Sequence, residues 1–170
     1  PRLRLVIAGD GEEREKLGEL AKELGVEKEV TFAGWISGGM DRFYSALDIN
    51  ALTSLSETFP YALTEGARFH LATVATAVGL IDQDVSGYLF APGDAETLGK
   101  RLAALGNDDA LRRDMGEKLY EKASRDFSIQ KTVDTQLHIY QEILRRSHRE
   151  KKARDGVVIC GAYGRGNAGD

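Results

Sequence analysis

Residues 49–77 read INALTSLSETFPYALTEGARFHLATVATA and carry the clearest fold signal in the chain. A short apolar segment, 49–53, leads through a loop, 54–60, into an amphipathic segment, 61–69. A second apolar segment, 71–77, follows. Short apolar runs are typical of buried strands, and apolar positions spaced three and four residues apart are typical of a helix. The order predicts two parallel strands joined by a right-handed crossover through a helix.

Two acids frame the start of the predicted helix. Glu57 lies in the loop before it, and Glu65 lies about one turn inside it. Ligands of parallel sheets bind beyond the carboxyl ends of the strands, where the free N–H groups of a helix start suit a phosphate. Ionised carboxylates only accept hydrogen bonds, so they suit the hydroxyls of a sugar or a ribose. The arrangement fits a nucleotide-sugar site, although the spacing alone favours two solvated acids near a helix dipole.

The alternation of strands and helices extends through most of the chain. Further short apolar, strand-like segments are residues 3–8, 30–33 and 87–90, and further helical segments are residues 12–24, 40–47, 95–105, 109–124 and 129–146. This order predicts an α/β, Rossmann-like, three-layer αβα fold with a parallel sheet covered on both faces, followed by an extended C-terminal helix.

Composition and charge exclude several classes of protein. Residues 1–144 hold 16 Lys and Arg against 24 Asp and Glu, and this acidic body argues against a nucleic-acid-binding domain. Cys160 is the single cysteine, so no internal disulfide can form and the reducing cytoplasm is the predicted location. No apolar run approaches the roughly 20 residues needed to span a bilayer. No signal peptide is visible, and the opening at Pro1 predicts a piece of a longer chain.

The C-terminal residues differ in charge and composition from residues 1–144. Residues 145–154, RRSHREKKAR, hold six Lys and Arg. They are interpreted first as a helix end followed by a linker, and alternatively as a patch that leans on an anionic membrane surface at the inner face. Residues 157–170, VVICGAYGRGNAGD, combine an apolar strand-like run with a Gly-rich loop. The predicted organisation is a domain at 1–144, a basic linker at 145–156, and the start of a second domain at 157–170.

The segment SETFPYALTEGA, residues 56–67, resembles the acidic-pair motif of retaining glycosyltransferases with the GT-B fold, family 4 or group 1. The segment at 5–37, LVIAGDGEEREKLGELAKELGVEKEVTFAGWIS, is similar to the strand, G-x-G turn, helix and strand that open the C-terminal half of that family. Residues 87–102, GYLFAPGDAETLGKRL, resemble its G-L-L-V-x-P-G-D segment. The resemblance runs from about Leu3 to about Tyr140, with the motifs in order.

The resemblance implies a domain that binds a nucleotide-diphosphate sugar and passes the sugar, with retention and without a metal, to an acceptor held by an N-terminal domain. It implies an acceptor in a cell-surface or cell-wall polysaccharide or glycolipid. Glu57 would be the catalytic residue and contact the donor sugar, and Glu65 would contact the ribose. The phosphates would be lined by Thr58, Phe59, Pro60, Tyr61, Ala62 and Leu63, and the base would lie at Gly34 and Trp35. Separately, Gly9 opens a Gly-Asp-Gly turn that could cradle phosphate, but the turn lacks the third glycine of a dinucleotide fingerprint and is interpreted first as a tight turn between strand and helix.

The sequence departs from the family after Glu65. His70 and Ala72 stand where the family has Gly and Pro, and Gly79 runs into Leu80 where a G-G-x-x-E turn is expected. The family's first strand of this half, whose Arg and Lys neutralise the diphosphate, would precede Pro1, so the fragment alone is predicted to be inactive. Two alternatives stay open: a degenerate, non-catalytic domain for nucleotide-sugar binding or docking, and a nucleotide-sugar epimerase, which shares this architecture.

Residues 157–170 are similar to the opening strand and loop of polysaccharide pyruvyl transferases, which implies a fusion of two enzymes of polysaccharide synthesis. Metal chemistry is not expected. The pair Asp82 and Asp84 resembles the D-x-D motif of another glycosyltransferase fold but is interpreted as a solvated turn. His70, His138 and His148 show no ligand spacing.

Overall fold

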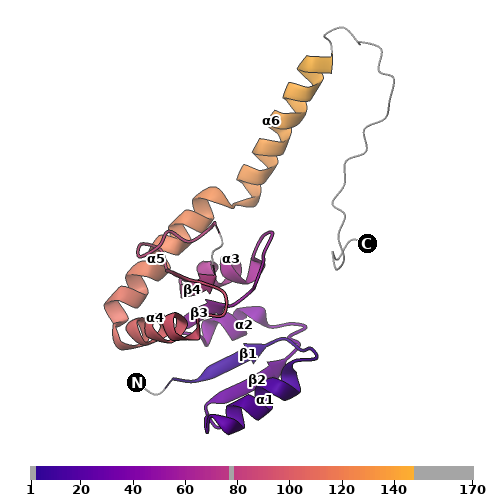
Figure 1. The fold of residues 1–170 in the computed structure, drawn as a ribbon. Helices are drawn as coiled ribbons and strands as arrows, with labels where there is room; N and C mark the ends of the chain where they lie inside the picture. The colour runs from indigo at the N-terminus through magenta and orange to yellow at the C-terminus, as the bar shows by residue number, and fades with distance from the viewer. Residues whose placement is uncertain (1–2, 77–78, 148–170) are drawn as a thin grey trace. The chain divides into compact units, whose positions relative to one another are not determined.

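The computed structural model describes residues 3–76 and 79–147 (Figure 1). The chain divides into two compact units, residues 1–128 and 129–170. The first unit alternates strands and helices, and the second contains one described helix. In chain order the elements are β1 (Leu5–Ala8), α1 (Arg14–Glu23), β2 (Val30–Gly34), α2 (Met40–Ser45), β3 (Ile49–Leu52), α3 (Tyr61–Arg68), β4 (Ala72–Thr76), β5 (Tyr88–Phe90), α4 (Ala95–Asn107), α5 (Asp109–Asp126) and α6 (Ile129–Ser147).

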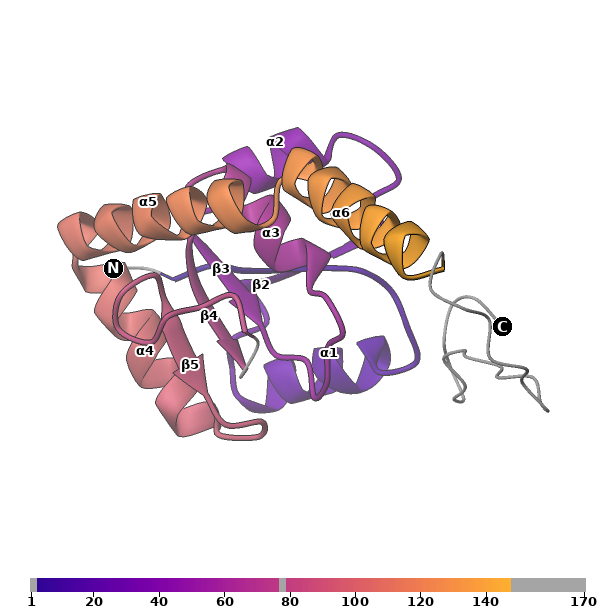
Figure 2. The same ribbon diagram turned by 90° about the horizontal axis from the view of Figure 1, so that it is seen from above.

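Three of the strands form a parallel sheet in the order β3-β4-β5 (Figure 2). Ile49 is paired with Ala72, and Val74 is paired with Tyr88. The central strand, β4, is buried along its whole length, which explains why its sequence is a continuous run of small and apolar residues. Helix α3 forms the connection between β3 and β4, as the sequence predicted.

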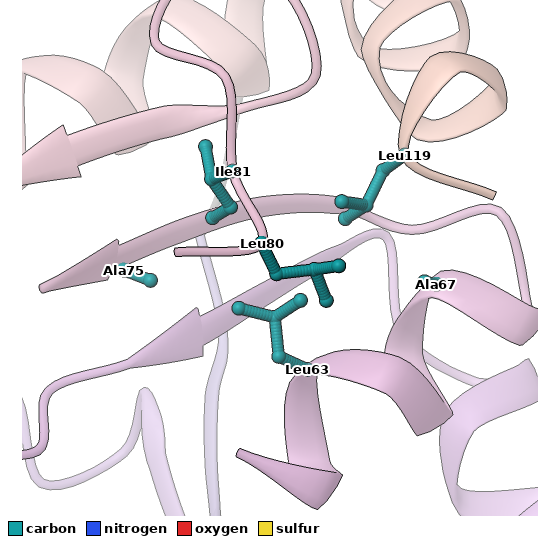
Figure 3. Close-up of a cluster of buried hydrophobic side chains, with 6 residues drawn as sticks. All are labelled: Leu63, Ala67, Ala75, Leu80, Ile81 and Leu119. Atoms are coloured by element: carbon teal, nitrogen blue, oxygen red, sulfur yellow. The ribbon is translucent and has the colours of Figure 1, made fainter. Parts of the chain in front are cut away.

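The two faces of this sheet are covered by different helices. Figure 3 shows one buried cluster, to which Ala75 of β4, Leu63 of α3 and Leu119 of α5 belong. Ala72 and Val74 of β4 belong instead to a second cluster, with Leu105 of α4. Side chains of a strand point alternately to opposite faces, so α3 and α4 pack on opposite sides of the sheet. The predicted three-layer α/β architecture is confirmed.

Strands β1 and β2 form a second, two-stranded parallel sheet, with Leu5 paired with Val30 and Ile7 with Phe32. The sequence predicted one continuous sheet, but within the described residues no pairing joins β1 to β3. Each of these two strands therefore bonds to a neighbour on one side only. The apolar pattern identifies strands and does not specify which strands are neighbours, which explains the difference.

The C-terminal predictions are mostly outside the described residues. The division of the chain falls after Ser128, whereas the sequence placed the end of the first domain at residue 144. The basic segment 148–156 and the pyruvyl-transferase-like segment 157–170 are not described, so the linker, the membrane-surface contact and the fusion stay predictions. No helix in the described part of the chain is long and apolar enough to cross a membrane.

Candidate functional site

Glu65 lies on the solvent side of α3, and its carboxylate is held by a neighbouring helix. The hydroxyl of Tyr44, from α2, donates a hydrogen bond to Oε2 of Glu65 over 2.9 Å. Burial raises the pKa of the Tyr44 phenol well above its ordinary value, and the hydrogen bond to Glu65 and the charge of Glu65 raise it further. The phenol therefore stays protonated and remains a donor to the Glu65 carboxylate.

Glu57 lies in the loop between β3 and α3 and is also exposed. Its Oε1 atom accepts a hydrogen bond of 2.6 Å from the Ser54 hydroxyl. The carbonyl oxygen of Ser54 accepts a second bond, also 2.6 Å, from the hydroxyl of Thr76 at the end of β4. The Thr76 bond ties the loop that carries Glu57, which follows β3 in the chain, to the carboxyl end of β4. This is the edge where ligands of such sheets bind.

Helix α3 begins between the two acids. Pro60 is its N-cap, and no side chain caps the helix start. The N–H groups of Leu63 and Thr64 donate to the carbonyl of Pro60, over 3.0 and 3.4 Å. The N–H groups of Tyr61 and Ala62 precede these and have no partner within a helix, because the first turn lacks a preceding carbonyl. They are the backbone donors that an anion at this helix start would meet.

The other residues predicted to line the phosphates differ in how far their side chains are buried. The side chain of Leu63 is fully buried in the core shown in Figure 3, so it cannot face a ligand. Pro60 is also buried, whereas Thr58 is exposed. The ring of Phe59 packs against Tyr61, with centroids 5.3 Å apart, and against Phe127, with centroids 5.6 Å apart.

Gly9, Gly34 and Trp35 lie together at the ends of β1 and β2. The N–H of Gly9 donates to the carbonyl of Gly34 over 2.8 Å, and Trp35 is 79% exposed. The guanidinium of Arg14 lies beside Gly34 and 3.6 Å from the carboxylate of Asp10. Among the described residues no hydrogen bond or ion pair links this group to Glu57 or Glu65, so their joint role in one site stays a prediction.

Sequence reasoning missed Tyr44, Asn50, Ser54 and Thr76. Asn50 lies in β3, and its amide donates to the carbonyl of Ala62 in α3 over 3.1 Å. Gly66 makes this contact possible, because a Cβ at residue 66 would lie 2.5 Å from Nδ2 of Asn50. An amide inside an otherwise apolar strand was the signal that could have identified Asn50, since buried polar groups require a partner. Tyr44 carried no such signal, because an aromatic residue in a helical segment is ordinarily interpreted as part of the hydrophobic core.

The other candidate motifs have structural partners. Asp82 is paired with Lys122 over 2.6 Å, and Asp84 is paired with Arg101 over 3.4 Å, which agrees with a turn at the protein surface. Within the described residues no group of three or more His, Cys, Asp or Glu side chains could hold a metal ion.

A hollow of about 310 Å³ lies between α3 and α5. Its lining includes Thr64, Arg68 and Phe127, but neither Glu57 nor Glu65.

Comparison with known proteins identifies the family. The profile of the family described as "Glycosyl transferases group 1" matches residues 1–122. The N-acetyl-alpha-D-glucosaminyl L-malate synthase of Bacillus anthracis is 30% identical over 146 residues, which cover 84% of this chain and 38% of that protein. The D-inositol 3-phosphate glycosyltransferase of Corynebacterium jeikeium is 32% identical over 164 residues, covering 91% of this chain and 39% of that protein. The chain spans about two fifths of the length of these relatives.

Solved structures share the fold. The C-terminal domain of the group 1 glycosyl transferase LpcC from Francisella tularensis superposes with a TM-score of 0.64 at 26% identity, covering 68% of this chain and 63% of that one. Anabaena HepE, solved in complex with UDP-glucose, superposes with a TM-score of 0.75 at 24% identity, covering 84% and 42%. This chain belongs to the glycosyl transferases group 1 family.

Proposed function

We propose that this chain is the donor-binding part of a retaining glycosyltransferase that uses a nucleotide-diphosphate sugar. The observation that carries the proposal is the pair of exposed carboxylates on either side of the α3 start, each held by a hydroxyl group. Two fixed acceptors with free amides between them match a ligand with hydroxyls at both ends and a diphosphate in the middle. The acceptor would be a polysaccharide or glycolipid, bound by an N-terminal domain outside these 170 residues.

Each part of the site has a separate role in this proposal. Glu65 accepts hydrogen bonds from the ribose hydroxyls, and Glu57 accepts them from the donor sugar. The amides of Tyr61 and Ala62, together with the positive end of the α3 dipole, face the diphosphate. As the bond between the sugar and the diphosphate breaks, negative charge grows on the leaving group, and these fixed donors stabilise it without having to reorganise.

The comparisons support a nucleotide-sugar donor. HepE was solved with UDP-glucose, and the relative from Corynebacterium jeikeium is named a glycosyltransferase. Because the chain covers only about two fifths of these relatives, donor binding is the activity expected of it by itself, and turnover is expected only in a longer polypeptide that also holds the acceptor.

Calorimetry tests this proposal on the 170-residue chain, with UDP, GDP, ADP and UDP-glucose as probes. We expect Glu65→Ala to weaken diphosphate binding by about 10-fold, the loss of roughly one charge-assisted hydrogen bond. Glu57→Ala should leave diphosphate binding unchanged and remove the additional affinity for the sugar-bearing nucleotide. Glu96→Ala is the control, since Glu96 is an exposed acid on α4 that pairs with Lys100. Wild-type binding by both Glu57→Ala and Glu65→Ala would contradict the site.

A non-catalytic binding or docking role is the second candidate. Its support is His70, which replaces a family glycine and is engaged in the fold, with Nδ1 lying 2.7 Å from Oε2 of Glu117. Donor binding without any transfer by the longer polypeptide would favour this role. Conversion of the donor sugar in the absence of an acceptor would instead identify an epimerase.

A further inference from the structure

We propose that Tyr44 is a positioning residue for Glu65, fixing its carboxylate in the orientation that the ribose hydroxyls require. This inference rests on the proposed function, because it gives Glu65 the task of binding the ribose. Tyr44 lies on α2, 21 positions before Glu65, and its hydroxyl donates directly to the Glu65 carboxylate.

The ring of Tyr44 is held in place on two sides. Its side chain is only 4% exposed. It stacks on Phe69, with ring centroids 5.6 Å apart and planes 17° apart, and it meets the edge of Phe43 at 5.5 Å. A ring packed in this way cannot turn its hydroxyl away from α3 without losing both aromatic contacts. The donor is therefore a fixed point against which the longer and more flexible Glu65 side chain is set.

The hydrogen bond from Tyr44 occupies only part of the acceptor capacity of the Glu65 carboxylate, so a ligand can still bind to it. A phenol has one proton to donate. The Glu65 oxygen is its nearer acceptor, at 2.9 Å, and the carbonyl of Ala62 is at 3.5 Å. An ionised carboxylate accepts on both oxygens, so Oε1 of Glu65 and a second site on Oε2 remain for two neighbouring hydroxyls.

Fixing Glu65 in advance strengthens ribose binding. The Glu65 residue is exposed, and an exposed Glu side chain samples many rotamers that a ligand would otherwise have to order. A preorganised group avoids that cost. Asn50 supports the same arrangement from the strand below, because its bond to the Ala62 carbonyl holds the first turn of α3 in place beneath Glu65.

Tyr44→Phe tests the inference, because it keeps the ring and removes only the donor. The probes are whichever of UDP, GDP and ADP binds the wild-type chain most tightly, and its 2′,3′-dideoxy analogue. We expect Tyr44→Phe to raise the dissociation constant of the ribonucleotide by about 2- to 10-fold, the net contribution of an ordinary hydrogen bond, and by no more than Glu65→Ala does. The constant for the dideoxy analogue should barely change, so the preference for the ribonucleotide should fall. A purely structural role would weaken both ligands equally.

Three further variants make the result decisive. Tyr88→Phe is the control, since Tyr88 is a buried tyrosine in the cluster on the α4 side of the sheet. In a Glu65→Ala background, Tyr44→Phe should have no further effect on the ribonucleotide preference. Phe69→Leu is a second test that leaves Tyr44 and Glu65 intact: it removes the ring on which Tyr44 stacks and should lower the same preference. An unchanged preference in either variant overturns the inference, whereas a wild-type chain that binds no nucleotide overturns the proposed function and the inference with it.

Discussion

His70 adopts a backbone conformation that most residues avoid. Its φ angle is +55°, in the left-handed region that favours glycine. The family resemblance has glycine at this position, and here the side chain compensates for the strain. The imidazole ring stacks on Tyr120 with centroids 4.1 Å apart, and Nδ1 lies 2.7 Å from a carboxylate oxygen of Glu117. The substitution that looked like a loss of the family pattern therefore brings two contacts to α5.

Two substitutions at residue 70 separate the strain from the contacts. His70→Ala removes both contacts and keeps the strain, whereas His70→Gly removes the contacts and the strain together. We expect His70→Gly to be more stable than His70→Ala by about 1 kcal/mol, the cost of a left-handed conformation for a residue with a Cβ. Urea unfolding of the two variants measures the difference. Equal stability, or a more stable Ala variant, would show that the backbone there relaxes without cost.

Helix α5 packs closely against the backbone at the start of β4, and Gly116 is the residue of α5 at the contact. A Cβ on Gly116 would lie 2.0 Å from the carbonyl oxygen of His70 and 3.2 Å from the amide nitrogen of Ala72. Both of these atoms belong to the backbone, so no side chain can move aside to make room. The close packing of α5 on the sheet thus depends on the absence of a side chain at this one position.

Gly116→Ala should therefore be strongly destabilising. Overpacking against the backbone forces the helix to shift, and we expect a loss of about 2 to 4 kcal/mol in the free energy of unfolding. Gly99→Ala in α4 is the matched control, because a Cβ on Gly99 meets nothing within 4 Å. Alanine is the better helix former, so the control should gain up to about 1 kcal/mol. Chemical denaturation of both variants tests the pair, and a Gly116→Ala variant as stable as wild type would refute the argument.

Within the described residues the protein has two sheets, whose edge strands are β1, β2, β3 and β5. Leu5 and Gly9 direct their N–H groups toward the β2 side, so the N–H of Val6 points to the open side of β1. Leu5 is 49% exposed and Val6 is 37% exposed, which leaves an apolar strand in contact with solvent. An open apolar edge accepts another strand, from the same polypeptide or from a second molecule.

We expect the 170-residue chain to self-associate as its concentration rises. Val6→Pro should reduce this association without unfolding β1, because proline is tolerated where the missing N–H faces away from the sheet. Ile7→Pro is the control, since it removes an N–H that faces β2 and should lower the melting temperature. Sedimentation velocity over a wide range of protein concentration measures the effect. A wild-type chain that stays monomeric throughout would show that these edges are protected.

The sequence predicted the kinds of element well and their pairing less well. The strand at Ile49–Leu52, the helix at Tyr61–Arg68 and the buried strand at Ala72–Thr76 were predicted within one or two residues, because apolar periodicity is a local property. The separation of β1 from β3 was not predicted, because pairing depends on segments far apart in the chain. In the candidate site, the two acids were predicted from a motif, whereas Tyr44, the hydroxyl partner of Glu65, comes from another helix and leaves no local pattern.

The close packing of Gly66 against Asn50 has a consequence for how the family can diverge. An alanine at residue 66 would press on the Asn50 amide and displace it from the Ala62 carbonyl. A small or apolar residue at position 50 would remove both the collision and the need for a partner. Positions 50 and 66 should therefore covary among homologues, with asparagine found beside glycine and alanine found beside an apolar residue, and each single change should be the less fit intermediate between the two pairs.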